Sequence, residues 1–164
     1  MNYLKEGKIL LYGIFILILI LDQLSKYIVV KYLKAESPVV IIKNFLQFHY
    51  VENYGAAFGI LQNRKIFFLI MTFIVILIII IFLKRNFYYL SNSMKLALVM
   101  LMAGAIGNLI DRIRLGYVID FISFRFLNRY NFPVFNVADS FVVISTVMII
   151  YMVIFNKYEV SRGL

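Results

Sequence analysis

The amino-acid sequence predicts an all-α membrane protein with four transmembrane helices and a small β-rich region on one side of the membrane. Of its 164 residues, 63% are hydrophobic and the mean hydropathy is +0.91, whereas soluble domains are roughly half apolar. Four segments contain apolar runs near the roughly 20 residues that a helix needs to cross a bilayer. We expect a single integral-membrane domain over residues 1–164, because the chain is too short for a second sizeable one.

The four expected spans cover about residues 9–30, 66–83, 94–111 and 136–155. The first begins like a secretory signal peptide, but "LDQLSKYIV" follows without a small-residue cleavage site, so we expect a retained helix. The second, "IFFLIMTFIVILIIIIFL", is the most uniformly apolar. The third contains "AGAIGN", whose small residues favour close packing between helices.

The connection between the first two spans is where we expect the β-rich region. It contains "VVIIKNFLQFHYV", a β-branched and aromatic stretch that favours a short strand or hairpin. The segment "YGAAFG" that follows is typical of a turn or a tight packing site.

Four spans place both termini and the 84–93 connection on one membrane surface, which we call the terminal face. The opposite surface, the loop face, carries the two long connections, about 31–65 and 111–135. The unusual polar residues all fall toward the loop face: Asp22, Lys26, Asn53, Asn108, Asp111, Arg112, Asp120, Asn136 and Asp139.

The terminal face carries an ordinary basic rim, formed by Lys5, Lys8, Lys84, Arg85, Lys95, Lys157 and Arg162 with Glu6 and Glu159. Basic residues at membrane edges explain the net charge of +9 better than nucleic-acid binding does. A count of Lys and Arg on the two faces does not decide the orientation. The short, basic 84–93 connection favours the terminal face as the cytoplasmic one.

Several loop-face residues have a structural interpretation beside a functional one. Asp22 and Lys26 are four residues apart on one helix, in the order that favours an ion pair, and that pair could itself fix a site. Asp111 and Arg112 are neighbours that cannot face each other, so Arg112 should find another partner or reach the interface. Asn108 lies one turn before Arg112 and could hydrogen-bond across helices.

Asp139, at the front edge of the fourth span, poses the same choice. Pro133 precedes the expected helix start, Asn136 is a favourable N-cap, and Asp139 would be the third helical residue. An acid there caps the helix and complements its dipole, which needs no further function. A helix N-terminus also favours the ionised carboxylate, which can be catalytic.

Asp120 lies in the apolar stretch "GYVIDFISF", so we expect its carboxyl to be at least partly desolvated, with a raised pKa unless it is paired. The alternative is an ion pair with one of Arg112, Arg114, Arg125 or Arg129. Asp120 and Asp139 flank the same connection on the same face. Two carboxylates held close cannot both ionise easily, so one can activate water while the other donates a proton, as in aspartic proteases.

Other hydrolase chemistries fit the sequence less well. The chain has no Cys, a single His (His49), and neither an HExxH nor a GxSxG motif. These absences argue against thiol, zinc and serine hydrolases. An Mg²⁺ site with oxygen ligands stays open as an alternative, with the candidate ligands Asp120, Asp139, Asn53 and Asn136.

Two functions of other kinds are also considered. A small transporter or proton channel would use Asp22, Asp111 and Asp139 as a relay, but a relay should have polar groups toward both leaflets, and here they stop at one. A membrane phosphatidyltransferase is a third alternative, and its DG-x₂-AR type motif is absent.

Four blocks of the sequence resemble, in order and spacing, the signature blocks of the bacterial lipoprotein signal peptidases. They are "LDQLSKYIV", "VENYGAAFGIL", "GAIGNLIDRIRLGYVIDFI" and "FNVADSFV", which span about residues 20–145. The resemblance implies a four-helix, cofactor-free aspartic endopeptidase that removes the signal peptide just before a diacylglyceryl-modified cysteine. It also implies that the first connection forms a β-cradle.

By the same resemblance, Asp120 and Asp139 are the catalytic dyad and no metal is bound. Positions that shape the site or meet the substrate would be Asp22, Lys26, Asn53, Gly55, Asn108, Arg112, Asn136 and Ala138. Phe58 and Phe121 could hold acyl chains or belong to the core. The expected partners are prolipoproteins, membrane lipid and cyclic peptide inhibitors of the globomycin type. We expect a monomer in the bacterial cytoplasmic membrane, with cytoplasmic termini and an extracytoplasmic active site.

Overall fold

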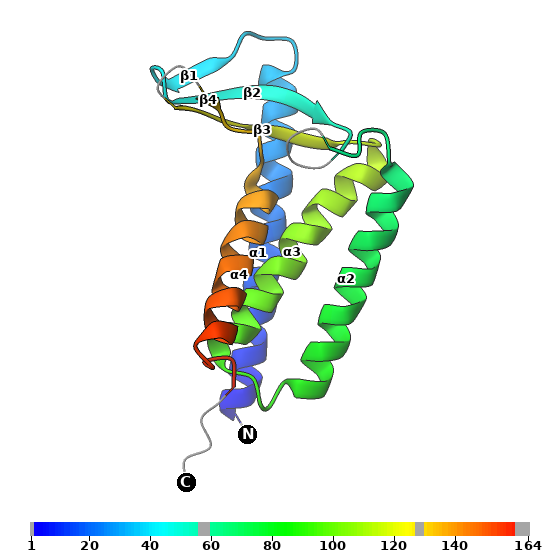
Figure 1. Ribbon diagram of the computed structural model, residues 1–164, viewed down its shortest axis with the longest axis vertical. Coiled ribbons are helices and arrows are strands. Elements are labelled where there is room, and N and C mark those ends of the chain that lie inside the picture. Colours follow the sequence, from blue (N-terminus) through cyan, green and yellow to red (C-terminus); the bar gives the residue numbers. More distant parts are fainter. Residues whose placement is uncertain (1, 56–59, 127–129, 160–164) are drawn as a thin grey trace.

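The computed structural model describes residues 2–55, 60–126 and 130–159, and its four helices carry a small sheet across one end (Figure 1). In chain order the elements are α1 (Asn2–Leu33), β1 (Val39–Ile42), β2 (Leu46–Asn53), α2 (Lys65–Asn86), α3 (Asn92–Arg114), β3 (Val118–Phe126), β4 (Tyr130–Asn131) and α4 (Val137–Ile154). Each helix is long and apolar enough to cross a membrane, which confirms the prediction of four spans. The sheet lies at the end opposite the start of α1, so it marks the loop face (Figure 1).

Helix α3 is the centre of the bundle, because α1, α2 and α4 all pack against it. Its contact surface is built from small residues. A Cβ added at Gly104 would lie 2.6 Å from the carbonyl oxygen of Ala138, and one at Gly107 would lie 2.6 Å from Oδ2 of Asp22. These glycines let α1 and α4 approach α3 closely, as "AGAIGN" predicts.

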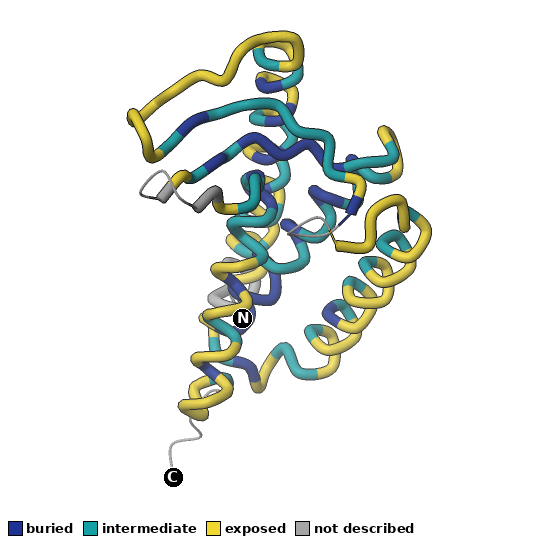
Figure 2. The backbone as a smooth tube through the Cα atoms, turned by 45° about the horizontal axis from the view of Figure 1, so that its top comes forward, coloured by how far each residue is buried: buried dark blue, intermediate teal, exposed yellow. Residues whose placement is uncertain are grey.

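The outward faces of the helices are apolar. Helix α2 buries only Ile79 among its residues, and its tube is largely coloured as exposed in Figure 2. Large apolar side chains such as Ile66, Phe73 and Ile78 stay exposed. A continuous apolar surface of this extent is unusual in water and suits contact with lipid hydrocarbon.

The sheet is antiparallel, with strand order β1-β2-β3-β4. The prediction of strands between the first two spans is confirmed by β1 and β2, but it was incomplete. Strand β3 comes from the second long connection and pairs with β2, with Val51 opposite Asp120 and Asn53 opposite Val118. Because β3 is buried along most of its length, it lacks the alternation of a half-exposed strand and reads only as an apolar run.

The sheet is fixed to the helix ends by a core cluster around Val29, Ile119 and Phe121. Phe121 is therefore a core residue, whereas Phe58 lies outside the described residues. The chain leading into α4 is held beside β3 by backbone hydrogen bonds between Ile122 and Phe135, of 2.8 and 3.1 Å. This pairing brings the first residues of α4 next to Asp120.

We expect Gly104→Ala to lower the thermal stability of the purified protein in detergent. The added methyl would also lie 2.8 Å from Cγ2 of Val142, and overpacking of this kind costs about 1–3 kcal/mol. Gly13→Ala in α1 is the matched control, because nothing lies within 4 Å of its added methyl and Ala favours a helix over Gly. Equal unfolding temperatures for the two variants would contradict the close approach of α3 and α4.

Candidate active site

A cavity of about 540 Å³ opens where the sheet meets α3 and α4. Its polar wall comes from four elements, β2, α3, β3 and α4, and from the connection after β2, and includes Asn53, Gly55, Asn108, Arg112, Asp120 and Asp139. Its remaining wall is mainly apolar, with Val118, the 132–135 segment and the α4 residues Val142, Val143 and Ile144. Six of the ten site residues expected from the sequence therefore line one cavity, although they are far apart in the chain.

Asp120 is 1% exposed, which confirms the expected desolvation. Its Oδ2 accepts a hydrogen bond from Nδ2 of Asn53 at 2.8 Å, and its Oδ1 accepts one from Nδ2 of Asn136 at 2.7 Å. Burial, followed by the charge of Asp139, raises the pKa of Asp120 to about 7, against the opposing effect of these hydrogen bonds. Asp120 can therefore carry a proton near neutral pH.

No salt bridge in the described part of the chain joins Asp120 to Arg112, Arg114 or Arg125. Arg129 lies outside the described residues. Amide donors from Asn53 and Asn136 occupy the carboxylate instead. The ion-pair alternative for Asp120 is thus not found among the described residues.

Asp139 caps α4, as predicted. Oδ1 of Asn136 accepts from the backbone N–H of Asp139 at 2.9 Å, and Oδ2 of Asp139 accepts from the backbone N–H of Asn136 at 3.1 Å. The other oxygen, Oδ1, accepts from Nδ2 of Asn108 at 2.7 Å. These donors and the helix N-terminus favour a negative charge at Asp139, whereas its partial burial disfavours one. The side chain also lines the cavity.

The fully buried side chain of Asn136 connects the two carboxylates. Its oxygen holds the backbone of Asp139, while its Nδ2 donates to Asp120 and lies 3.0 Å from Oδ1 of Asn108 and 3.3 Å from the carbonyl oxygen of Ile119. One amide thus sets the position of Asp120 relative to Asp139. Asn136 therefore caps α4 and also fixes the two carboxylates relative to each other, although it does not itself line the cavity.

Behind the cavity lies a buried cation, Lys26, which is 2% exposed. Its Nζ is 2.9 Å from Oδ2 of Asp22, which confirms the predicted pair, and 2.9 Å from Oδ2 of Asp111. It also donates to Oδ1 of Asn108 at 3.1 Å. The sequence did not reveal the pairing with Asp111, because it depends on how α1 is rotated against α3.

Asp22 and Ala138 connect this ion cluster to α4. Oδ1 of Asp22 accepts from the backbone N–H of Ala138 at 3.0 Å. Ala138 is completely buried and lies away from the cavity wall. A small residue is needed there because the carboxylate of Asp22 passes between Gly107 and the start of α4. Asp22, Lys26 and Ala138 therefore support the site from behind.

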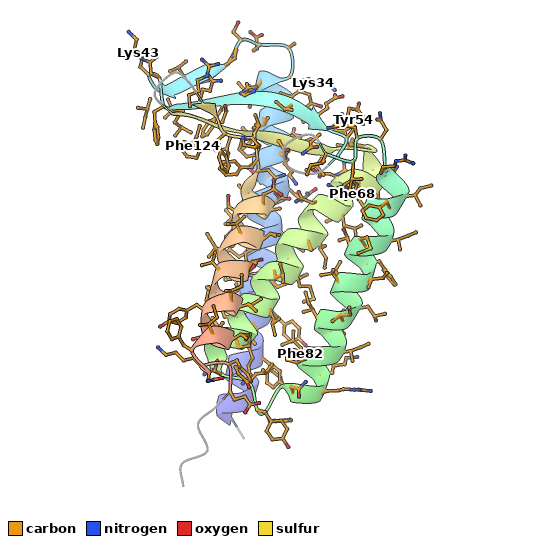
Figure 3. All side chains as sticks on the ribbon, viewed as in Figure 1. Lys34, Lys43, Tyr54, Phe68, Phe82 and Phe124 are labelled. Carbon is orange, nitrogen blue, oxygen red and sulfur yellow. The ribbon has the colours of Figure 1, made fainter. Side chains whose placement is uncertain are left out.

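Arg112 turns away from its neighbour Asp111, as expected. It donates to the carbonyl oxygen of Gly55 at 3.1 Å, and its guanidinium lies 4.7 Å from the ring centroid of Phe68 (labelled in Figure 3). The N–H of Gly55 in turn donates to Oδ1 of Asn53 at 2.9 Å. These contacts tie the end of β2 to α3 and direct the amide of Asn53 toward Asp120.

Glu52 and three tyrosines form a cluster that the sequence reasoning missed. The carboxylate of Glu52 accepts from the hydroxyls of Tyr50 and Tyr54, each at 2.8 Å, and those bonds lower its pKa to about 2. Tyr50 is 3.0 Å from the hydroxyl of Tyr117, and Lys34 reaches Glu52 at 3.4 Å. Lys34 and Tyr54 are labelled at the sheet end in Figure 3.

The alternation in "YVENY" could have revealed that cluster, since Tyr50 and Glu52 share one face of β2 and Tyr54, the first residue after the strand, reaches the same carboxylate. Asn53 points to the other face, toward Asp120. The cluster therefore anchors the strand that supplies the Asn53 amide.

In the part of the chain that the structure describes, no three His or acidic side chains are grouped so as to hold a metal ion.

The chain is similar to proteins of one family over most of its length. The family model described as signal peptidase (SPase) II matches residues 14–155. The lipoprotein signal peptidase of Caldanaerobacter subterraneus subsp. tengcongensis is 47% identical over 140 residues, which are 84% of this chain and 91% of that protein. The lipoprotein signal peptidase of Clostridium tetani is 41% identical over 146 residues, covering 86% and 90%.

The fold has a counterpart among solved structures as well. A bacterial membrane enzyme determined by the in meso method at 2.3 Å matches with a TM-score of 0.80 and 34% identity, over 94% of this chain and 93% of that chain. These likenesses support the peptidase interpretation and not the transporter alternative. The chain belongs to the signal peptidase II family.

Proposed function

We propose that this peptidase is an intramembrane aspartic endopeptidase in which Asp120 and Asp139 form the catalytic dyad. The observation that carries the proposal is that one buried amide, Asn136, holds both carboxylates on the wall of a single cavity. The substrates are diacylglyceryl-modified prolipoproteins, cut just before the lipid-modified cysteine. The names of the relatives, lipoprotein signal peptidases, support that substrate class.

We infer the roles of the two carboxylates from their different surroundings. Asp139, at a helix N-terminus with two further donors, is the ionised general base that takes a proton from water. Asp120, whose pKa is raised to about 7, is the protonated acid that donates to the carbonyl oxygen of the scissile peptide. The C–N bond of the resulting tetrahedral diol then breaks as Asp139 gives the leaving nitrogen the proton that it took from water, and Asp120 takes a proton from one of the diol hydroxyls.

The cavity suits a substrate that arrives from the bilayer. Part of its wall is the outer face of α4, where Val143 is 61% exposed and Ile144 is 50% exposed. A lipid-anchored peptide can therefore reach the dyad sideways, with its acyl chains along apolar α4. Arg112 lines the same cavity and would orient the polar part of the substrate.

We place the terminal face in the cytoplasm and the loop face, with its sheet and dyad, on the extracytoplasmic side of the cytoplasmic membrane. The signal peptide would then lie along the helices while its cleavage site meets the dyad near the interface. The reaction uses water and two carboxylates and needs no cofactor. Cyclic peptides of the globomycin type would compete for the same cavity, and a monomer contains all of these residues.

Asp120→Asn and Asp139→Asn should each lower the rate at which a lipid-modified prolipoprotein is cleaved by about 10³-fold or more, as measured in a gel-shift assay. The reason is that neither amide can transfer the required proton. Glu36→Gln, at an exposed carboxyl outside the cavity, is the matched control and should stay active. Comparable unfolding temperatures would show that the variants still fold. Full activity in either Asp variant would contradict the proposal that both carboxylates are catalytic. Loss of wild-type activity on adding a chelator would favour the Mg²⁺ alternative.

The pH dependence of kcat/KM should show a fall as the pH rises through about 7, since Asp120 must be protonated and its pKa is raised to about that value. Asn53→Ala removes a donor that favours the ionised form of Asp120. The pKa of Asp120 should then rise further, so the falling limb should move to higher pH while the rate drops. Asn86→Ala, at the far end of α2, is the control; a limb that stays in place or moves to lower pH in Asn53→Ala would contradict this role.

A further inference from the structure

A second cavity, of about 460 Å³, lies at the opposite end of the molecule from the dyad. It is bordered by the first turns of α1, the last turns of α2 and the middle of α3. Its walls are apolar and aromatic, formed by Leu11, Tyr12, Phe15, Ile80, Leu83, Phe87, Tyr88, Val99 and Met102. Two lysines, Lys8 and Lys84, complete its lining. A volume in this range is typical of sites for small molecules.

This cavity exists because α1 and α2 have little direct contact along the residues that the structure describes. Both pack on α3, and the space between them is not closed by side chains. Except for Phe87 and Tyr88, the residues that line the cavity belong to helices able to cross a membrane. In a bilayer, an apolar space of this kind is filled by hydrocarbon, so the occupant must include an acyl chain.

The cavity has two cations in its lining, Lys8 and Lys84, and two more, Arg85 and Lys95, belong to the same end of the molecule. Nζ of Lys8 lies 5.0 Å from the ring centroid of Phe87, and Nζ of Lys95 lies 4.7 Å from the same ring. Lys84 and Arg85 lie in the last turn of α2. None of these four cations forms a salt bridge with a carboxylate in the described ranges. The charge at this end therefore calls for an anionic partner from the membrane.

We propose that the space between α1 and α2 binds an anionic phospholipid, with one acyl chain in the cavity and the phosphate between Lys8 and Lys84. Basic pockets between transmembrane helices bind acidic headgroups in this manner. Tyr12 and Tyr88 are both strongly exposed beside the lysines, at the depth where aromatic side chains meet headgroups. This site is separate from the dyad and does not depend on the proposed catalytic mechanism.

The test uses the purified full chain in mild detergent and native mass spectrometry, with phosphatidylglycerol or phosphatidylcholine of identical chains as the probe. Wild type should retain phosphatidylglycerol in clear preference to phosphatidylcholine. The double variant Lys8→Gln/Lys84→Gln should bind phosphatidylglycerol about tenfold more weakly or worse. Lys157→Gln is the matched control, because Lys157 belongs to the same basic rim and lies outside the cavity; its binding should match wild type.

Three outcomes would overturn the proposal: equal retention of the two lipids by wild type, unchanged binding in the double variant, or an equal loss in Lys157→Gln. A further arm adds inorganic phosphate or glycerol phosphate as competitor. Neither should displace the lipid, since both lack the acyl chain. Displacement would show a site for a soluble anion instead. Unfolding temperatures measured without added lipid should be the same for all variants, because both substituted lysines are at the membrane edge.

Discussion

The buried charge of Lys26 is the constraint on which the rest of the structure depends. A cation this far from water is tolerated only when it is paired and hydrogen-bonded, and here Asp22 and Asp111 approach it at 2.9 Å each. Because the two carboxylates come from α1 and α3, the pairing fixes these helices in depth and rotation. The close approach that it needs is possible because Gly107 has no side chain.

Two side-chain amides, those of Asn108 and Asn136, connect the ion cluster around Lys26 to the carboxylates on the cavity wall and hold them in position. Asn108 accepts from Lys26 and donates to Asp139, while Asn136 contacts Asn108, Asp120 and the backbone of Asp139. Amides suit this task because each has both donors and an acceptor and stays neutral at every relevant pH. Both carboxylates of the proposed dyad accept their hydrogen bonds from amide N–H groups, and Arg112 is a cation on the wall of the same cavity. The ion cluster of Lys26, Asp22 and Asp111 lies behind that cavity.

The sequence predicted the features that depend on residues close together in the chain. It did not predict those that depend on how distant segments pack. Apolar length predicted four helices, and short spacings predicted the Asn136–Asp139 cap and the Asp22–Lys26 pair. Strand β3 was missed because it is buried on both faces and has no alternation. The Lys26–Asp111 pair and the Arg112–Gly55 bond join residues far apart in the chain, so they depend on packing. The resemblance names ten site residues but does not say which of them line the cavity and which support it from behind.

The spacing of Asp22 and Lys26 also matters before the fold is complete. A protein chain is made from its N-terminus, so α1 reaches the bilayer before α3 can offer Asp111. The i, i+4 spacing supplies Lys26 with a counter-charge inside its own helix, which reduces the penalty for a lone charge among lipids. Helix α3 then adds Asp111, and α4 adds the Ala138 N–H to Asp22. The order of synthesis is thus the order in which the polar groups gain their partners, and α4, which brings Asp139, completes the proposed catalytic site last.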